Sequence, residues 1–509
     1  MLAKTLSVAL VGADAHLVEV EVHATQGVPN FTVVGLPAKS VREAEQRTRS
    51  ALLSSDQRWP PCRTVANLAP ASLRKEGTHF DLAIAMGILA ADRRLDPAQA
   101  GGWVFVGELS LDGSVRPVRG VLPAAIAARR SGCRGLVCPA RNAGEASLVD
   151  DLTVVPVETL GQGISFLRNA WSPPPIATAA RDQAASGDVD DMSEVRGQPF
   201  ARAAVEVAAA GGHNLLMEGS PGCGKTMIAR RLPGILPPMS KEEALDVTRV
   251  HSVAGLIGED ARLVDQRPFR TPHHNVSVAG LVGGGPGLPR PGEAVLAHHG
   301  VLFLDELPLF RRDVLESLRG PLEDGAVRIA RSAGVVTFPC KFSLVAAMNP
   351  CPCGHGSDSG RCRCPLQAIQ AYKARVSGPL LDRFDLQLGM TRLDATALLS
   401  EPPGESSAAI RSRVELARAR QRERYESPTE TNANVTNATI RRRGRFRPEA
   451  FEQLHSVIDR YRLTGRGVDR VLRVARTVAD LEGDPDVQAR HVDFALGLRG
   501  VAEPAEVAA

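Results

Sequence analysis

The sequence predicts an α/β protein in which a central α/β core lies between a first α/β domain and a helical C-terminal domain. Near the middle of the chain, the apolar run 215–217 is followed by the glycine-rich segment 219–226 and then by a helical pattern. Further along, a second apolar run, 301–304, ends in Asp305 and Glu306. A strand that leads through a glycine-rich turn into a helix lets backbone amides surround a phosphate.

The 509 residues are enough for about three domains of ~150 residues each. Residues 1–170 form the first predicted domain, and residues 171–191, rich in Pro, Ala, Ser and Asp, form a linker. The phosphate-binding core covers 192–390, and a largely helical block covers 391–509. Within the first domain the predicted strands are 17–22, 31–34 and 103–106, and the predicted helices are 40–54 and 82–91.

The composition is that of an ordinary globular protein, with 23% charged residues and a net charge of +4. Any binding of a polyanion must therefore depend on local basic patches. No apolar run is long enough to span a bilayer. The first ten residues resemble a weak signal peptide, but Asp14, His16 and Glu19 soon interrupt the apolar pattern. We therefore expect a cytoplasmic protein with no membrane partner.

The segment 219–226 fits G-x-x-x-x-G-K-[ST], the pattern of a P-loop. Its glycines let backbone N–H groups turn toward the β-phosphate, Lys225 reaches the β- and γ-phosphate oxygens, and the Thr226 hydroxyl is a Mg²⁺ ligand. The alternative is a chance glycine-rich turn, which the flanking strand and helix argue against. The predicted ATP-binding residues are Gly219, Ser220, Pro221, Gly222, Cys223, Gly224, Lys225 and Thr226.

Three polar residues at the ends of apolar strands complete the predicted ATPase site. Asp305 is expected to hold Mg²⁺ together with Thr226, and Glu306 to orient and deprotonate the attacking water. Asn349 ends the apolar run 342–348 and is expected to sense the γ-phosphate. For Asp305 and Glu306, the alternative is a pair of solvated acids at a strand end.

Together with the segment 380–385 (LLDRFD), these features resemble an AAA+ ATPase. Other segments are similar to the Mg-chelatase-like group, and within it to the ComM/YifB family of bacterial competence-linked ATPases. These segments are 267–274 (RPFRTPHH), 291–293 (PGE), 318–323 (LRGPLE) and 349–354 (NPCPCG). The resemblance covers essentially the whole chain.

This resemblance implies a ring, expected to be a homo-hexamer, with ATP bound between subunits. Arg383 then corresponds to an arginine finger, and Arg466 to a second sensor at the start of the lid helix. Arg470, one helical turn later, is the substitute candidate for the sensor. The alternative for Arg383 is a surface ion pair with Asp382 or Asp385.

Two insertions are candidates for contact with a substrate in the ring pore. The segment 251–292 is rich in Gly and Pro and is predicted to be a mobile loop, and 326–338 is predicted to be a β-hairpin with Arg331 near its tip. By the same resemblance, Arg270, Arg328 and Arg331 are expected to contact DNA phosphates. The alternative is that these arginines bridge subunits.

Four cysteines lie close together directly after Asn349. They are Cys351, Cys353, Cys362 and Cys364, and four thiolates on a short loop suit a tetrahedral structural Zn²⁺ site. The spacing is tighter than that of common zinc fingers, and His355 could replace one cysteine. Unused free thiols are the alternative.

In the first domain, the segments 74–82 and 107–118 resemble the proteolytic domain of Lon, of the ribosomal S5 domain 2-like fold. Lon-type hydrolysis needs a serine activated by a lysine. Where that serine would lie, this chain has His79, Phe80 and Asp81, and 121–123 (VLP) lie near the position of the lysine. We therefore expect a non-catalytic collar.

The sequence thus favours an ATP hydrolase that drives DNA translocation or branch migration in homologous recombination and natural transformation. Its expected partners are single-stranded or branched DNA, further copies of the chain and recombination proteins. The alternative is a protein-remodelling ATPase, either chelatase-type or related to Lon but without peptidase activity. A passive DNA-binding scaffold is a weaker option, because Asp305 and Glu306 are both present.

Overall fold

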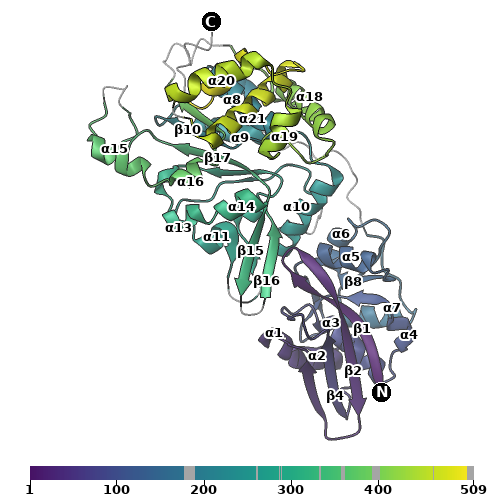
Figure 1. Ribbon diagram of the computed structural model, residues 1–509. Coiled ribbons are helices and arrows are strands. Elements are labelled where there is room, and N and C mark those ends of the chain that lie inside the picture. Colours follow the sequence, from purple (N-terminus) through teal and green to yellow (C-terminus); the bar gives the residue numbers. More distant parts are fainter. Residues whose placement is uncertain are drawn as a thin grey trace.

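The structure of the protein is a computed structural model. It describes residues 1–176, 190–258, 262–285, 287, 289–331, 334–356, 361–392, 402–461 and 463–500. Most of the predicted linker, 177–189, therefore lies outside the described residues. Figure 1 shows the N-terminal domain at one end, the P-loop core in the middle and the helical lid at the other end. The α/β fold class with a helical C-terminal region is confirmed.

The N-terminal domain is built on a seven-stranded mixed sheet with the order β3-β4-β2-β1-β5-β8-β9. Its strands are β1 Leu2–Val11, β2 Asp14–Thr25, β3 Asn30–Val34, β4 Arg63–Ala69, β5 Trp103–Phe105, β8 Gly135–Pro139 and β9 Thr153–Val157. The first residues of the chain thus form a strand inside a sheet, antiparallel to β2 and parallel to β5.

One buried helix fills the centre of this domain. Every residue of α3 Asp81–Ala91 is buried, which explains why the helix is apolar on all sides. The predicted helix 40–54 was only partly correct, because Glu43 separates α1 Lys39–Arg42 from α2 Ala44–Ser54. The remaining elements are α4 Pro97–Ala100, β6 Glu108–Leu109, β7 Val115–Arg116, α5 Val121–Arg130, α6 Ala143–Ala146 and α7 Leu160–Leu167.

The core holds a five-stranded parallel sheet with the order β11-β14-β17-β10-β18. Its strands are β10 Leu215–Gly219, β11 Phe269–Arg270, β14 Val301–Leu304, β17 Ser343–Met348 and β18 Leu386–Met390. Successive side chains alternate between the two faces, and both faces are apolar. Parallel strands bring their carboxyl ends to one edge, where the predicted site residues follow β10, β14 and β17.

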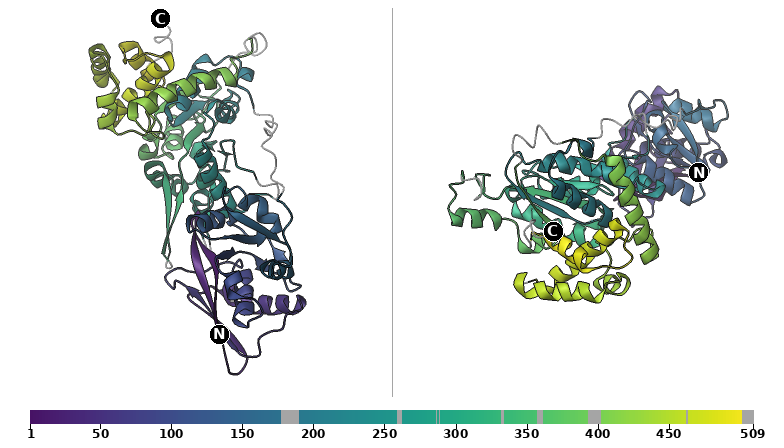
Figure 2. Two further views of the ribbon diagram at one scale, coloured as in Figure 1. Left: turned by 90° about the vertical axis from the view of Figure 1, so that its right-hand side faces the viewer. Right: turned by 90° about the horizontal axis from the view of Figure 1, so that it is seen from above.

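One face of this sheet shares its apolar core with the lid. It is covered by α8 Pro199–Gly211 and α9 Lys225–Ile235, on which the lid helices pack. The lid helices are α18 Ser407–Tyr425, α19 Asn437–Arg443, α20 Pro448–Tyr461, α21 Gly465–Glu482 and α22 Ala489–Gly497. The lid is therefore joined to the core by a continuous apolar cluster. Figure 2 shows the lid helices lying against the core.

The opposite face carries the inserted elements. They are α10 Lys241–Ala254, α11 Val278–Val282, β12 Gly283–Gly284, β13 Arg290–Pro291, α12 Glu293–Leu296, α13 Arg312–Glu316, α14 Arg319–Asp324, β15 Ala326–Arg331 and β16 Gly334–Pro339. The predicted hairpin is confirmed as β15 and β16, and its tip, 332–333, lies outside the described residues. Helices α15 Leu366–Lys373 and α16 Gly378–Leu381 connect β17 to β18.

The N-terminal domain docks directly onto this inserted face. Ala13, in the turn between β1 and β2, is fully buried in the apolar cluster of the core. Its neighbour Gly12 has φ +66° and lies so close to β16 that a Cβ would be 2.3 Å from the Thr337 carbonyl oxygen. Arg249 of α10 also pairs with Asp14 at 2.5 Å. The N-terminal domain and the hairpin are thus in direct contact.

Within the described residues, no helix is both long enough and apolar enough to cross a membrane.

Candidate functional site

The P-loop connects the carboxyl end of β10 to the first turn of α9. Gly222 and Gly224 have φ values of +80° and +92°, which side chains other than glycine rarely adopt. A Cβ on Gly219 would lie 2.5 Å from the Met390 carbonyl oxygen. The glycines are therefore required by the backbone path, which turns the amides of the loop toward the N-terminus of α9.

Lys225 is the first residue of α9 and is buried. Its Nζ donates to the carbonyl oxygens of Gly219 and Ser220 at 2.5 and 3.1 Å. It also donates to Asn349 Oδ1 at 3.2 Å. Lys225 and Asn349, predicted from separate strands, are thus brought together.

Thr226 and Asp305 are joined in the same way. The Thr226 hydroxyl donates to Asp305 Oδ2 at 2.9 Å, and the backbone N–H of Glu306 donates to Asp305 Oδ1 at 2.9 Å. Glu306 adopts a left-handed conformation with φ +52°, and its half-exposed carboxylate lies 3.9 Å from His274 Nδ1. A strained backbone at this point sets the direction of the Glu306 side chain.

These residues fit Mg²⁺ and a nucleoside triphosphate. The hydroxyl and carboxylate oxygens of Thr226 and Asp305 form a hard donor set of the kind that Mg²⁺ accepts, and Lys225 supplies positive charge for phosphate oxygens. Helix α9 begins at this loop, so its N-terminal dipole adds to the attraction for anions. Glu306 lies beside the metal residues, where a general base for water would be needed.

Arg383 and Arg466 lie elsewhere, in a cavity of about 640 Å³ between the core and the lid. No residue of the P-loop lines this cavity. Arg383 pairs with Glu323 of α14, not with Asp382 or Asp385 as the surface alternative had it. Burial and the nearby charges of Arg466 and Arg470 lower the pKa of the Arg383 guanidinium.

The two candidate sensors, Arg466 and Arg470, differ in how exposed their side chains are and in how closely acids contact them. The Arg466 side chain is 74% exposed, with Asp382 Oδ2 4.0 Å away. Arg470 is largely buried and lies 3.5 Å from Asp382 and 3.8 Å from Asp385. Arg466 is therefore the residue able to reach outward, while Arg470 holds the lid to the core.

The sequence did not indicate a buried hydrogen-bond network that connects the core to the lid. It consists of His213, Asp385 and Thr477. His213 Nδ1 lies 3.0 Å from Asp385 Oδ2, and its Nε2 lies 2.8 Å from Thr477 Oγ1 of lid helix α21. His213 also bonds across a wide sequence separation, so no local pattern could have identified it. This hydrogen-bond network holds the segment that contains Arg383 in place against the helix that contains Arg466.

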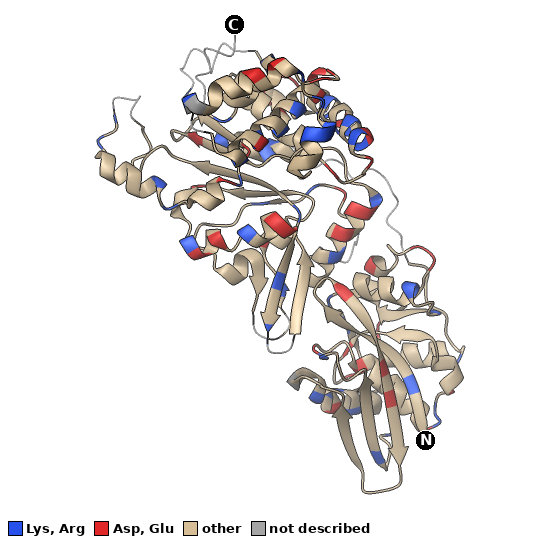
Figure 3. Cartoon of the chain, in the orientation of Figure 1, with Lys and Arg blue, Asp and Glu red and all other residues tan. Residues whose placement is uncertain are grey.

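The three predicted pore arginines do not behave alike. Arg270 lies in β11, inside the core sheet, and makes two hydrogen bonds to the Glu293 carboxylate at 2.6 and 2.9 Å. The prediction of a loop was therefore wrong for residues 269–270, which form a strand of the core sheet. The Arg270 guanidinium is bound to the Glu293 carboxylate. Arg328 and Arg331 lie on the exposed strand β15, whose basic positions are visible in Figure 3.

The four cysteines converge, as metal ligands would. The Sγ atoms of Cys351, Cys353 and Cys362 lie 3.3–3.7 Å apart, and Cys364 lies within 4.8 Å of each of them. A tetrahedral site with Zn–S bonds of about 2.3 Å places sulfurs ~3.8 Å apart. The backbone N–H of His355 and the neighbouring thiols lower the pKa of Cys353 to about 6. The residues therefore fit Zn²⁺.

This cysteine loop rests against the P-loop. The Ser220 hydroxyl donates to the His355 carbonyl oxygen at 3.1 Å. A Cβ on Gly354, whose φ is +85°, would lie 2.9 Å from the Pro221 ring. The shape of the cysteine loop and the shape of the phosphate cradle are thus coupled.

In the N-terminal domain, the residues at the position of the Lon serine are structural. His79 is buried, its Nε2 lies 2.7 Å from the Val8 carbonyl oxygen, and burial lowers its pKa to about 4. The Arg47 guanidinium makes two hydrogen bonds to the buried Asp81 carboxylate at 2.6 and 2.9 Å. In the part of the chain that the structure describes, neither His79 nor Asp81 makes a hydrogen bond to a serine hydroxyl.

Comparison with known families supports this description. The chain matches a magnesium chelatase subunit ChlI model over residues 191–398. It also matches a model of subunit ChlI of Mg-chelatase over 20–142 and one of the ChlI C-terminal region over 404–499.

Individual relatives extend over the whole chain. An uncharacterized protein of Mycobacterium tuberculosis is 46% identical over 499 residues, and competence protein ComM of Haemophilus influenzae is 43% identical over 507 residues. Each alignment covers 98% of both chains. A Lon protease of Chloroflexus aurantiacus is 27% identical over 192 residues, which are 35% of this chain and 22% of that protein.

Proposed function

The chain belongs to the Mg-chelatase-like ComM/YifB family of AAA+ ATPases, and from this premise we propose that it forms a ring that moves a DNA strand. Membership of the family makes the chain an ATPase that uses ATP and Mg²⁺. The proposal adds the ring, expected to be a hexamer, and the DNA substrate.

One observation supports the proposal that the chains assemble into a ring. Lys225, Thr226, Asp305 and Asn349 form one half of an ATPase site, while Arg383 and Arg466 line a different cavity that contains no P-loop residue. A single chain therefore does not bring its arginines to its own phosphate cradle. In a closed head-to-tail ring, the arginine cavity of one subunit faces the P-loop of the next.

In such a ring, Arg383 supplies positive charge to the γ-phosphate of the neighbouring site, and release from Glu323 accompanies this step. Arginine fingers contribute about 10³–10⁵ in rate where they have been measured. Arg466, more exposed than Arg470, acts beside Arg383 on the same phosphate group.

The proposal of a DNA substrate is based on two arginines of the hairpin β15–β16. Arg328 lies 3.5 Å from Asp324, and their side chains are 66% and 49% exposed. Arg331 Nη2 lies 3.4 Å from the Gly285 carbonyl oxygen. Such weakly held guanidinium groups are available for phosphates. Arg270 is left out of the proposed contact, because Glu293 holds it.

Zn²⁺ at the four cysteines has a structural role in this proposal. Four protein thiolates complete a tetrahedral site and leave no position for water. Because Ser220 contacts the cysteine loop, the metal stabilises the P-loop from one side.

A protein substrate is the second candidate, and the match to a Lon protease over 35% of the chain favours it. In this case the collar, docked on the hairpin through Gly12, would receive a polypeptide.

The deciding experiment measures ATP hydrolysis by the assembled protein with and without single-stranded or junction DNA, followed by strand exchange on a labelled four-stranded junction. The DNA proposal requires stimulation and exchange, both lost in an Arg328→Ala/Arg331→Ala variant. If DNA causes neither, while an unfolded protein stimulates hydrolysis, the protein-remodelling function replaces it.

A further inference from the structure

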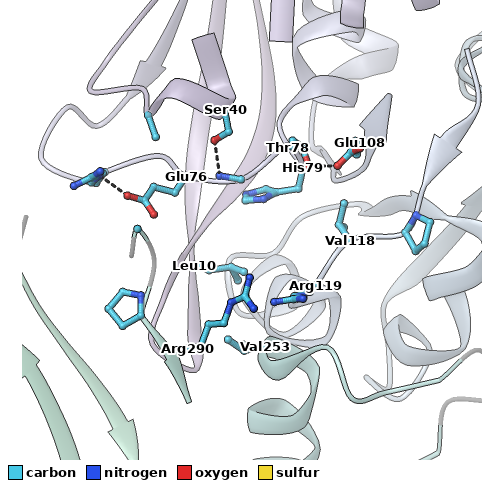
Figure 4. A pocket seen from close by; sticks show the side chains of 16 residues that line it. Leu10, Ser40, Glu76, Thr78, His79, Glu108, Val118, Arg119, Val253 and Arg290 are labelled. Carbon is cyan, nitrogen blue, oxygen red and sulfur yellow. Dashed lines mark hydrogen bonds and ion pairs between the residues drawn. The ribbon is translucent and has the colours of Figure 1, made fainter. Parts of the chain in front are cut away.

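A cavity of about 630 Å³ lies between the N-terminal domain and the inserted elements of the core (Figure 4). The N-terminal domain contributes Arg119, Glu76 and Glu108, and the core contributes Arg290 and Val253. Its volume is within the range of ligand sites. None of the predicted site residues lines it.

Two arginines, one from each domain, point into this cavity without a partner. Arg119 follows β7 and Arg290 lies in β13, and Figure 4 shows both guanidinium groups directed into the space between Leu10 and Val253. Both side chains are exposed, and within the described chain neither makes a hydrogen bond or ion pair. Two like charges directed into one cavity favour an anion between them.

The acids of the cavity do not neutralise these arginines. Glu76 pairs with Arg74 at 2.5 Å, and Glu108 accepts a hydrogen bond from the Thr78 hydroxyl. Glu108 keeps its negative charge, so the arginines that line the cavity, Arg74, Arg119 and Arg290, exceed the acids Glu76 and Glu108 by one positive charge. Of the three arginines, Arg119 and Arg290 are the two without an ion-pair partner among the described residues.

The β12–β13 ribbon that carries Arg290 lies beside strand β15 of the exposed hairpin. Arg290 pairs through the β12–β13 ribbon with Gly284, and the Arg331 guanidinium lies next to Gly284 and Gly285. On the other side, Gly287 approaches Glu76 so closely that a Cβ would be 3.2 Å from its carboxylate. Arg331 of the hairpin thus lies beside the ribbon that carries Arg290, and Arg290 shares the cavity with Arg119 of the N-terminal domain.

We propose that Arg119 and Arg290 bind the phosphodiester backbone of a DNA strand where it passes between the hairpin and the collar. This inference rests on the proposed function and extends it, because it gives the N-terminal domain a part in holding DNA. The residues that line the cavity include no Phe, Tyr or Trp, so bases have no stacking surface there. The contact is therefore with phosphates and independent of sequence.

The test is the salt dependence of binding of a labelled single-stranded oligonucleotide to the full-length protein. Each phosphate contact contributes about 0.7 to the slope of log K against log salt, so Arg119→Ala/Arg290→Ala should lower the slope by about 1.4. If the variant and the wild type bind equally at 1 M salt, this change of slope gives a loss of roughly 25-fold in affinity at 0.1 M salt.

Two further variants serve as controls. Arg58→Ala/Arg63→Ala removes two exposed arginines of the same domain that lie outside the cavity, and it should keep the slope of the wild type. Arg119→Lys/Arg290→Lys preserves the charges and should keep most of the slope. The melting temperature of each variant shows whether it is still folded, so that weaker DNA binding can be attributed to the lost phosphate contacts.

The possible outcomes differ in what they overturn. If the wild type binds no DNA, the proposed function fails, and this inference fails with it. If the wild type binds DNA but the Ala variant has the same slope, only the cavity inference fails. If poly-aspartate binding depends on Arg119 and Arg290 while DNA binding does not, the cavity accepts an acidic polypeptide, which also overturns the inference.

Discussion

The buried histidine of the N-terminal domain gives a quantitative test of its structural role. Burial lowers the pKa of His79 from 6.5 to about 4. The folded state thus holds the neutral imidazole, so its stability contribution is complete above pH 6.5 and is lost as the pH falls toward 4. With these two pKa values, lowering the pH from 8 to 5 costs about 2 kcal/mol of unfolding free energy through His79 alone.

The perturbation is His79→Gln, which removes the titration but keeps a donor for the Val8 carbonyl oxygen. Between pH 8 and 5, this variant should lose about 2 kcal/mol less stability than the wild type. Because Asp81 and all other groups are present in both proteins, the difference isolates His79.

Tryptophan fluorescence makes the assay specific. The three tryptophans, Trp59, Trp103 and Trp171, lie in or directly after the N-terminal domain, so urea unfolding followed by their emission reports on that domain within the full chain. His23→Gln, an exposed histidine of the same domain, is the matched control and should retain the wild-type acid response. An identical acid response in wild type and His79→Gln would refute the reasoning.

Three further outcomes follow from the ATPase half-site and its surroundings. Glu306→Gln should retain ATP binding but lower turnover by about 10²–10⁴, measured by steady-state hydrolysis and nucleotide titration, and unchanged turnover would exclude a role as general base. Reduced protein should contain about one zinc per chain, and Cys353→Ser should lower both the zinc content and the ATP affinity, the latter by a few-fold, because one hydrogen bond joins the cysteine loop to Ser220. Arg270→Ala should lower the melting temperature through loss of the Glu293 pair but leave the salt slope of DNA binding unchanged, and a lower slope would restore Arg270 as a phosphate contact.

The phosphate cradle could be predicted because its chemistry is local. The P-loop occupies eight consecutive residues, and the strand before it and the helix after it are visible in the pattern of apolar residues. Asp305 and Asn349 were predictable for a related reason. Both follow apolar strands, and parallel strands bring their carboxyl ends to the same edge of a sheet.

Contacts between distant segments were not predictable. The partner of Arg383 is Glu323, on a helix before the hairpin, and not one of the acids next to it in sequence. Arg270 lies in a segment rich in Gly and Pro, which is typical of a loop, but two of its residues add a strand to the sheet beside β14. The unpartnered pair Arg119 and Arg290 exists only because two domains meet, so no single segment could indicate it.

The central claim is that one ATPase site is built from two chains, and mixing two inactive variants tests it most directly. Lys225→Ala removes the phosphate-binding lysine from its own chain, and Arg383→Ala removes the arginine that, in the proposed ring, contacts the ATP of the neighbouring chain. Each variant alone should be nearly inactive. In a ring assembled at random from equal amounts, about a quarter of the interfaces join an intact cradle to an intact Arg383.

The measurement is the ATP hydrolysis rate of the mixture after subunit exchange, relative to wild type at the same total concentration. The shared site predicts recovery to about a quarter of the wild-type rate if the interfaces act independently. A mixture no more active than either variant alone would place Arg383 and Lys225 in the same chain's site and contradict the account.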